Sequence, residues 1–184
     1  MANITTSAKD IIVIDTSEAV GALSQLVRGF AGLSMSSVKT MTANVHAQVI
    51  KNQADIRGLR IMDHGNAQGC QIGNDFVTTA NFSSFLPDLL KLQGCFCPYT
   101  GFVHMLNCLM GQNTALMLEF AKWWNVPVYA GEWYTNALGL NMYAHPYKGL
   151  LTGLIKAIPD PFLGFQQWVR VDPSGTVTRN VSVP

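Results

Sequence analysis

The sequence is organised by short apolar runs that alternate with segments of helical periodicity. The run Ile11-Ile12-Val13-Ile14 is β-branched throughout, and similar runs recur further along the chain. Short continuous runs of this kind, bounded by Gly, Pro or Asn, are typical of strands buried on both faces of a parallel sheet. We expect strands at about 11–15, 38–42, 59–62, 101–108 and 126–131, and helices at about 16–30, 45–56, 83–90 and 112–124.

This alternation predicts an α/β fold with right-handed crossovers, in which a mostly parallel central sheet carries helices on both faces. The length of 184 residues suits one domain, 1–184. Its core is expected at about 11–133, followed by a C-terminal extension at about 134–184 that is rich in Gly, Pro and aromatic residues. Within the extension, Pro173-Ser174-Gly175 predicts the turn of a hairpin between 167–172 and 176–181.

Composition narrows the possible classes of function. Apolar residues make up 48% and charged residues 12% of the chain, which excludes disorder and indicates a surface partly covered by a partner domain or a second copy. A net charge of +1 predicts neither nucleic-acid nor membrane binding, and no apolar run reaches the ~18 residues of a membrane span. Because the first ten residues are polar and there are only four cysteines, we expect no signal peptide, no disulfide scaffold and a cytoplasmic setting.

Two strand ends carry residues with nucleophilic chemistry. Asp63-His64-Gly65 follows one apolar run, and Cys108 closes another before a predicted helix. In open α/β sheets, chemistry gathers where parallel strands end, so we hypothesise a Cys108–His64 dyad. The helix N-terminus would favour the thiolate, His64 would act as base, and the N–H groups of Gly65 and Cys108 would form an oxyanion hole.

Other interpretations of these residues stay open. Cys108 can be an ordinary buried cysteine, and His64 can lie at a strand end without a function. Cys95 and Cys97, together with Cys70 and His64, could form a zinc site, but the paired Cys-x-x-Cys spacing of structural zinc sites is missing. We therefore expect no metal. No nucleotide-binding fingerprint occurs either, and no cofactor is expected.

The chain resembles the caspase-like (clan CD) cysteine peptidases, which include caspases, gingipains, separases and bacterial CHAT peptidases. It is most similar to a bacterial, CHAT-allied caspase-like family of unknown function. The resemblance spans about residues 11–133. It rests on Ile14-Asp15-Thr16-Ser17, His64-Gly65, Gly69, Gln71-Ile72-Gly73 and Cys108-x-x-Gly111. Asp63 stands where Ser is usual before the His, and Asn107 where Gly or a small residue is usual before the Cys.

The resemblance implies a caspase-like three-layer sandwich and a cysteine endopeptidase acting on a peptide or protein substrate. Cys108 inherits the role of nucleophile, His64 that of base and Gly65 that of oxyanion support. Three acidic residues near strand ends are candidates for a pocket that binds a basic P1 side chain: Asp15, Asp63 and Glu132. The alternative is a catalytically inactive module that binds a partner protein through its C-terminal third.

Overall fold

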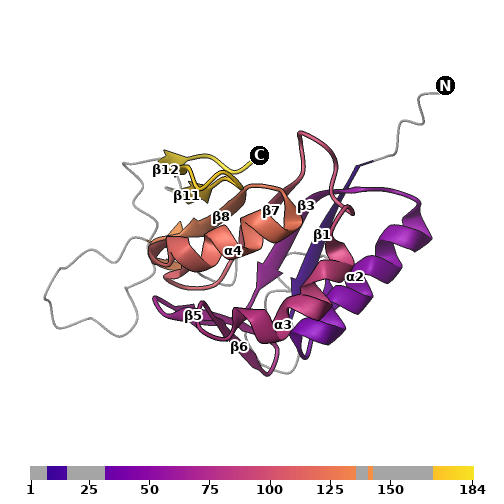
Figure 1. The fold of residues 1–184 in the computed structure, drawn as a ribbon, viewed down its shortest axis with the longest axis horizontal. Helices are drawn as coiled ribbons and strands as arrows, with labels where there is room; N and C mark the ends of the chain where they lie inside the picture. Colours follow the sequence, from indigo (N-terminus) through magenta and orange to yellow (C-terminus); the bar gives the residue numbers. More distant parts are fainter. Residues whose placement is uncertain (1–7, 16–31, 136–140, 143–167) are drawn as a thin grey trace, which may run out of the picture.

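The computed structural model describes residues 8–15, 32–135, 141–142 and 168–184 (Figure 1). A seven-stranded sheet runs through the described part of the chain in the order β12-β11-β8-β7-β3-β1-β2. The neighbouring pairs among its first five strands along the chain are all parallel: β1 (Lys9–Ile14), β2 (Leu33–Ser34), β3 (Ile56–Met62), β7 (Phe102–Met105) and β8 (Val128–Gly131). The predicted α/β class with a mostly parallel sheet is therefore confirmed.

The C-terminal hairpin belongs to the same sheet. The strands β11 (Trp168–Val171) and β12 (Val177–Val181) pair with each other in antiparallel orientation, and β11 also pairs antiparallel with β8. A hairpin is thus present within the predicted ranges 167–172 and 176–181, and its described strands are Trp168–Val171 and Val177–Val181. Sequence periodicity does not reveal that this hairpin extends the main sheet, because the pairing of β11 with β8 is set by tertiary contacts.

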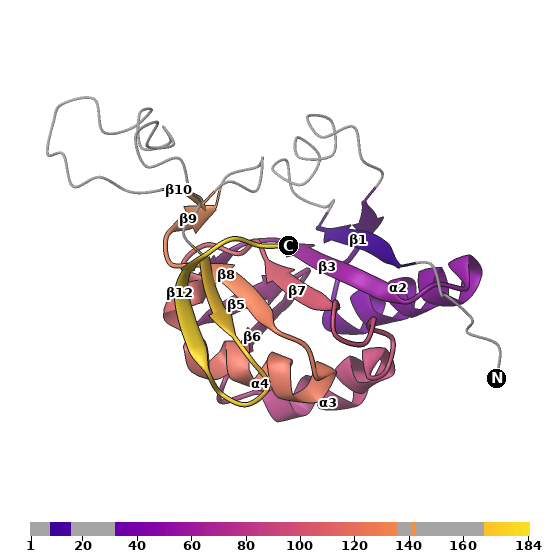
Figure 2. The same ribbon diagram turned by 90° about the horizontal axis from the view of Figure 1, so that it is seen from above.

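Three α-helices lie together on one face of the sheet (Figure 2). They are α2 (Val38–Asn52), α3 (Phe82–Leu89) and α4 (Thr114–Trp124). The predicted helix at 16–30 lies outside the described residues. The helical layer that can be described therefore covers a single face.

The predicted strand at 38–42 is wrong, because these residues form the first turns of α2. Ser37 is the N-cap: its side chain accepts the N–H of Thr40, and the Thr40 side chain accepts the N–H of Ser37. This capping box satisfies two N–H groups that the first helical turn leaves without partners. Val38, Met41 and Val45 are buried at helical spacing, which outweighs the weak alternation in the sequence. The predicted helix at 45–56 accordingly begins earlier and ends at Asn52.

Two other predicted helix boundaries also shift. The helix predicted at 83–90 begins at Phe82, and Pro87 lies inside it, where it cannot donate a backbone hydrogen bond. The helix predicted from residue 112 is split. A short 3-10 helix at Met110–Gln112 comes first, and α4 begins at Thr114 behind the N-cap Asn113.

A small second sheet lies at the end toward which β1 and β3 point (Figure 1). It consists of β4 (Gly65–Asn66), β5 (Gly69–Ile72) and β6 (Asp75–Thr78), paired antiparallel in that order. The sequence predicts only a hairpin or loop around 70–75. A further short antiparallel pair joins β9 (Tyr134–Thr135) and β10 (Asn141–Met142).

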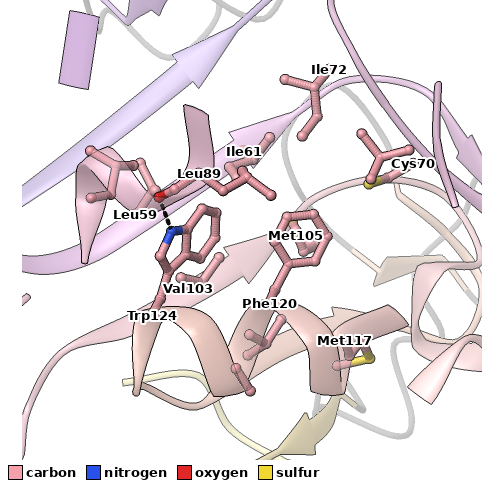
Figure 3. Packing of buried hydrophobic residues seen from close by; sticks show 14 of the residues in the cluster. Leu59, Ile61, Cys70, Ile72, Leu89, Val103, Met105, Met117, Phe120 and Trp124 are labelled. Atoms are coloured by element: carbon pink, nitrogen blue, oxygen red, sulfur yellow. Dashed lines mark hydrogen bonds between the residues drawn. The ribbon is translucent and has the colours of Figure 1, made fainter. Parts of the chain in front are cut away.

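The main hydrophobic core lies between the sheet and the three helices (Figure 3). The Trp124 indole is buried against Phe120, at a centroid distance of 5.1 Å, and its N–H donates to the Leu89 carbonyl at 2.9 Å. Fully burying one such apolar side chain stabilises the fold by roughly 1.5–3 kcal/mol. The neighbouring Trp123 lies at the surface.

The opposite face of the sheet carries a row of two aromatic side chains with an arginine at each end. The Arg60 guanidinium lies 5.4 Å from the Phe102 ring centroid, and Phe102 meets Tyr129 edge-on at 5.9 Å. Arg170 lies 5.9 Å from the Tyr129 ring on the far side. Closer to the carboxyl ends of the strands, a small apolar cluster follows, made of Ile14, Met62, Leu106 and Trp168.

Candidate active site

The residues singled out in the sequence gather at one edge of the main sheet. In the neighbouring strands β3 and β7, Ile61 pairs with Met105, so both strands end at the same level. The chain then continues into Asp63 and His64 after β3, and into Asn107 and Cys108 after β7. Two further acidic candidates directly follow the neighbouring strands: Asp15 after β1 and Glu132 after β8.

The chain segments that follow the two strands pass close to each other at Gly65. A Cβ atom at Gly65 would lie 2.8 Å from the Cβ of Asn107, 3.0 Å from the Cys108 carbonyl oxygen and 3.3 Å from the Cys108 nitrogen. Such distances leave no room for a side chain, so glycine is needed because the backbone of Cys108 passes next to it. The structure therefore brings the His64-Gly65 segment and the Cys108 backbone together.

The side chain of Asn107 connects the two segments by hydrogen bonds. Its Nδ2 donates to the carbonyl oxygens of His64 at 2.7 Å and of Gln71 at 3.0 Å, and the residue is fully buried. Sequence analysis identified Asn107 only as a departure from the family pattern. A polar residue within the apolar stretch between Met105 and Met110 was the available signal, since buried amides are retained where they have specific partners.

The Asp63 side chain binds the backbone at two positions, His64 and Gly73. Its carboxylate accepts the His64 N–H and the Gly73 N–H, both at 2.7 Å. Burial raises the pKa of Asp63 to about 6, against the opposing effect of these two hydrogen bonds, and the negative charge of Asp15 adds to the increase. The carboxylate predicted for a substrate pocket is thus engaged with the backbone that carries the candidate base.

The other two pocket candidates differ in their surroundings. Asp15 is buried, with 5% of its surface exposed. Glu132 is half-buried and forms an ion pair with Arg179 from β12, which compensates its charge. Asp15 and Asp63 lie close enough for their charges to interact, so the carboxylates gather on the β1–β3 side of the edge.

Cys108 is partly buried in a turn between β7 and the helices. The next residue, Leu109, has a left-handed backbone (φ 60°), and its N–H donates to the Trp133 carbonyl at 2.9 Å. The sequence predicts Cys108 directly before the helix at 112–124, but in the structure Cys108 does not adjoin α4. The 3-10 helix Met110–Gln112 intervenes, and at the start of α4 the Asn113 side chain accepts the Leu116 N–H.

The other three cysteine thiols, Cys70, Cys95 and Cys97, have raised pKa values. Burial raises the pKa of the Cys70 thiol to about 12, and it also raises the pKa values of Cys95 and Cys97. Among the described residues, no group of three or more His, Cys, Asp or Glu side chains is placed to hold a metal ion. No helix in that part of the chain is long and apolar enough to cross a membrane.

Comparison with known proteins gives only distant structural similarity. No family model matches the sequence, and no curated protein matches it. A secreted C11 cysteine protease from Bacteroides thetaiotaomicron, solved in complex with an irreversible peptide inhibitor, is similar with 10% sequence identity and a TM-score of 0.42. The alignment covers 74% of this chain and 51% of that protein, so the chain spans about half of its length. A similarity at this level assigns no role to any residue of this chain.

Proposed function

We propose that this chain is a caspase-like cysteine endopeptidase with Cys108 as nucleophile and His64 as general base. The observation that supports this most directly is the close approach of Gly65 to the Cys108 backbone. It brings a histidine-bearing segment and a cysteine-bearing segment together at the carboxyl edge of a parallel sheet. This edge is where α/β proteins bind ligands.

The proposed reaction proceeds by acyl transfer. His64 takes the proton from the Cys108 thiol, and the thiolate adds to the scissile carbonyl carbon to give a tetrahedral oxyanion. The N–H groups of Gly65 and Cys108 are the proposed donors to that oxyanion. His64 then protonates the leaving amine as the C–N bond breaks. Water hydrolyses the remaining thioester, releasing the acid and restoring the thiol.

The proposed substrate is a peptide or protein with a basic P1 residue. Asp15 and Asp63 supply negative charge next to the proposed dyad. Glu132 contributes less than the sequence suggested, because Arg179 compensates it. A panel of peptides that differ only at P1 tests this preference, and we expect Arg and Lys to be cleaved faster than Leu or Asp.

The decisive experiment is competitive alkylation of the full chain with iodoacetamide at pH 7, followed by peptide mapping. Because the thiol pKa values of Cys70, Cys95 and Cys97 are raised, these residues provide a slow internal background. We expect Cys108 to be labelled first and Cys108→Ala to abolish peptide hydrolysis. We expect His64→Ala to slow hydrolysis by about 10²–10⁴-fold, as for other general bases.

The opposite result would overturn the proposal. If Cys95 or Cys97 reacts before Cys108 and no peptide in the panel is cleaved, the dyad is inactive. The inactive interaction module would then be the better description of the chain.

A further inference from the structure

We infer that Asn107 is a positioning residue that fixes the His64–Gly65 peptide relative to Cys108. This inference rests on the proposed function, because it concerns the orientation of one proposed oxyanion donor, the Gly65 N–H. The residue adjoins Cys108 in the chain, and its amide is bonded to the backbone of the segment that carries His64. One side chain therefore couples both halves of the proposed dyad.

The orientation of the Asn107 amide is determined by its partners. Both partners are carbonyl oxygens, those of His64 and Gln71, so only the NH₂ group can face them. The His64 carbonyl also accepts the Gln71 N–H at 2.9 Å. Its oxygen thus accepts two hydrogen bonds, one from β5 and one from Asn107, which fixes the direction of this carbonyl.

The direction of the carbonyl sets the direction of the next N–H. In a planar trans peptide, the C=O and the N–H point to opposite sides. The N–H of Gly65 therefore points away from the Gln71 amide and from the Asn107 side chain. Gly65 lies opposite Cys70 in a pair that is not hydrogen-bonded, so this N–H points away from β5. It faces the side of β4 on which the described residues place no further strand. The β4–β5 ladder therefore does not use this N–H, which is a requirement for a donor to an oxyanion.

The backbone on the Cys108 side is anchored as well. The Leu106 N–H donates to the Ile61 carbonyl of β3 at 2.8 Å, and the Leu109 N–H donates to the Trp133 carbonyl. Asn107 lies between these two anchors and is fully buried. Because the backbone on both sides is held, the Asn107 amide fixes the position of the His64–Gly65 peptide relative to Cys108.

The test compares Asn107→Ala with Asn113→Ala in the full chain. Asn113 is a matched control: its Nδ2 also donates to a backbone carbonyl, that of Gln68 at 2.9 Å, and its Oδ1 caps α4. Two rates are measured for each folded variant. One is hydrolysis of a P1-Arg peptide, which forms an oxyanion, and the other is alkylation of Cys108 by iodoacetamide, which does not.

We expect Asn107→Ala to lower kcat by about 10²-fold, the order found when one oxyanion donor is lost. Alkylation of Cys108 should change far less, and Asn113→Ala should leave both rates close to those of the original chain. If folded Asn107→Ala hydrolyses peptides at the original rate, or if both rates fall equally, the inference is overturned.

A second measurement does not depend on activity. In ¹H–¹⁵N spectra, Asn107→Ala should shift the Gly65 and Gln71 amide signals and speed hydrogen exchange at Gln71, whereas Asn113→Ala should not. Unchanged Gly65 and Gln71 signals would overturn the inference. If these signals shift while the unmodified chain cleaves no peptide, the proposed peptidase function fails but the positioning of the peptide by Asn107 stands.

Discussion

The two ends of the main sheet shift the pKa of an aspartate in opposite directions. At the amino end of β1, the Asp10 carboxylate accepts two hydrogen bonds from the Arg57 guanidinium, at 2.9 and 2.5 Å. Its Oδ2 also forms an ion pair with Nη1 of Arg60 at 3.3 Å. The hydrogen bonds with Arg57 are the main cause that lowers the pKa of Asp10. At the carboxyl end of β3, Asp63 is bonded by backbone N–H groups, and burial raises its pKa to about 6.

This difference distinguishes the amino end, where the aspartate stabilises the fold, from the carboxyl end, where the aspartate has the perturbed pKa typical of functional sites. Paired charges at the amino end are stable at neutral pH and stay ionised. The carboxyl end keeps a partly buried acid, Asp63, with a pKa of about 6, which costs stability. Perturbed acids of this kind concentrate at functional sites, although structural networks also produce them. The comparison therefore supports the carboxyl edge as the place to look for chemistry.

The largest expected effect comes from Gly73, which carries one of the N–H groups bonded to Asp63. A Cβ at Gly73 would lie 2.1 Å from the Ser36 carbonyl carbon, and its φ of 61° is unfavourable for other residues. Backbone strain and overpacking together should lower the free energy of unfolding of Gly73→Ala by about 3 kcal/mol or more in a urea titration.

Gly94→Ala is the matched control for this substitution. Gly94 has a similar φ of 78°, but nothing lies within 4 Å of its Cβ position, so this variant isolates the backbone strain. If the two variants lose equal free energy of unfolding, the close packing of Gly73 against Ser36 adds nothing to the backbone strain, and this prediction is wrong.

An intermediate effect is expected from the pH dependence of Asp63. Because its folded pKa of about 6 exceeds the ordinary value of 3.8, the folded state binds more protons than the unfolded state between these values. Stability is therefore highest below pH 4 for this group and falls as the pH rises toward 6, by about 1–2 kcal/mol after allowance for solvent screening. Denaturant titrations between pH 4 and 7 should show this fall in the original chain and a flatter profile in Asp63→Asn.

The smallest effect is expected at Asp10, and its pH dependence has the opposite sign. The lowered pKa of Asp10 stabilises the fold above its ordinary range, and this contribution is lost as the pH falls through the folded value. Asp10→Asn should cost at most about 1 kcal/mol at pH 7, as is usual for partly exposed ion pairs, and less in high salt. A thermal melt that shows Asp10→Asn to be as harmful as Gly73→Ala would contradict the division between the two edges.

Much of the fold follows from local patterns in the sequence. The apolar runs locate β1, β3, β7 and β8, because buried parallel strands need continuous apolar residues. The strand prediction is wrong at residues 38–42, because five residues with weak alternation fit a strand and a helix start equally well. The capping box at Ser37 and Thr40 decides in favour of the helix, and Ser-x-x-Thr is a weaker sequence signal than a capping box that ends in Glu or Gln.

The site is less predictable from the sequence than the fold. The strand ends that carry His64 and Cys108 could be located, because parallel strands place their ends at one edge. The roles of Asn107 and Asp63 could not be derived, since each depends on backbone groups that the fold alone brings near, such as the Gln71 carbonyl and the Gly73 N–H. Side-chain bonds to backbone groups far along the chain leave no periodic trace in the sequence.

His104 of β7 meets Trp168 of β11 edge-on, with ring centroids 4.2 Å apart, and this contact has a consequence for how the chain folds. The two residues are separated by more than sixty positions in the sequence, so closing the loop between them costs conformational entropy that only completed contacts repay. We expect β7 to pair with its parallel neighbours before Trp168 arrives, and the face that carries His104 to be sealed late in folding. Pulsed hydrogen exchange would test this order, which fails if β11 is protected as early as β3.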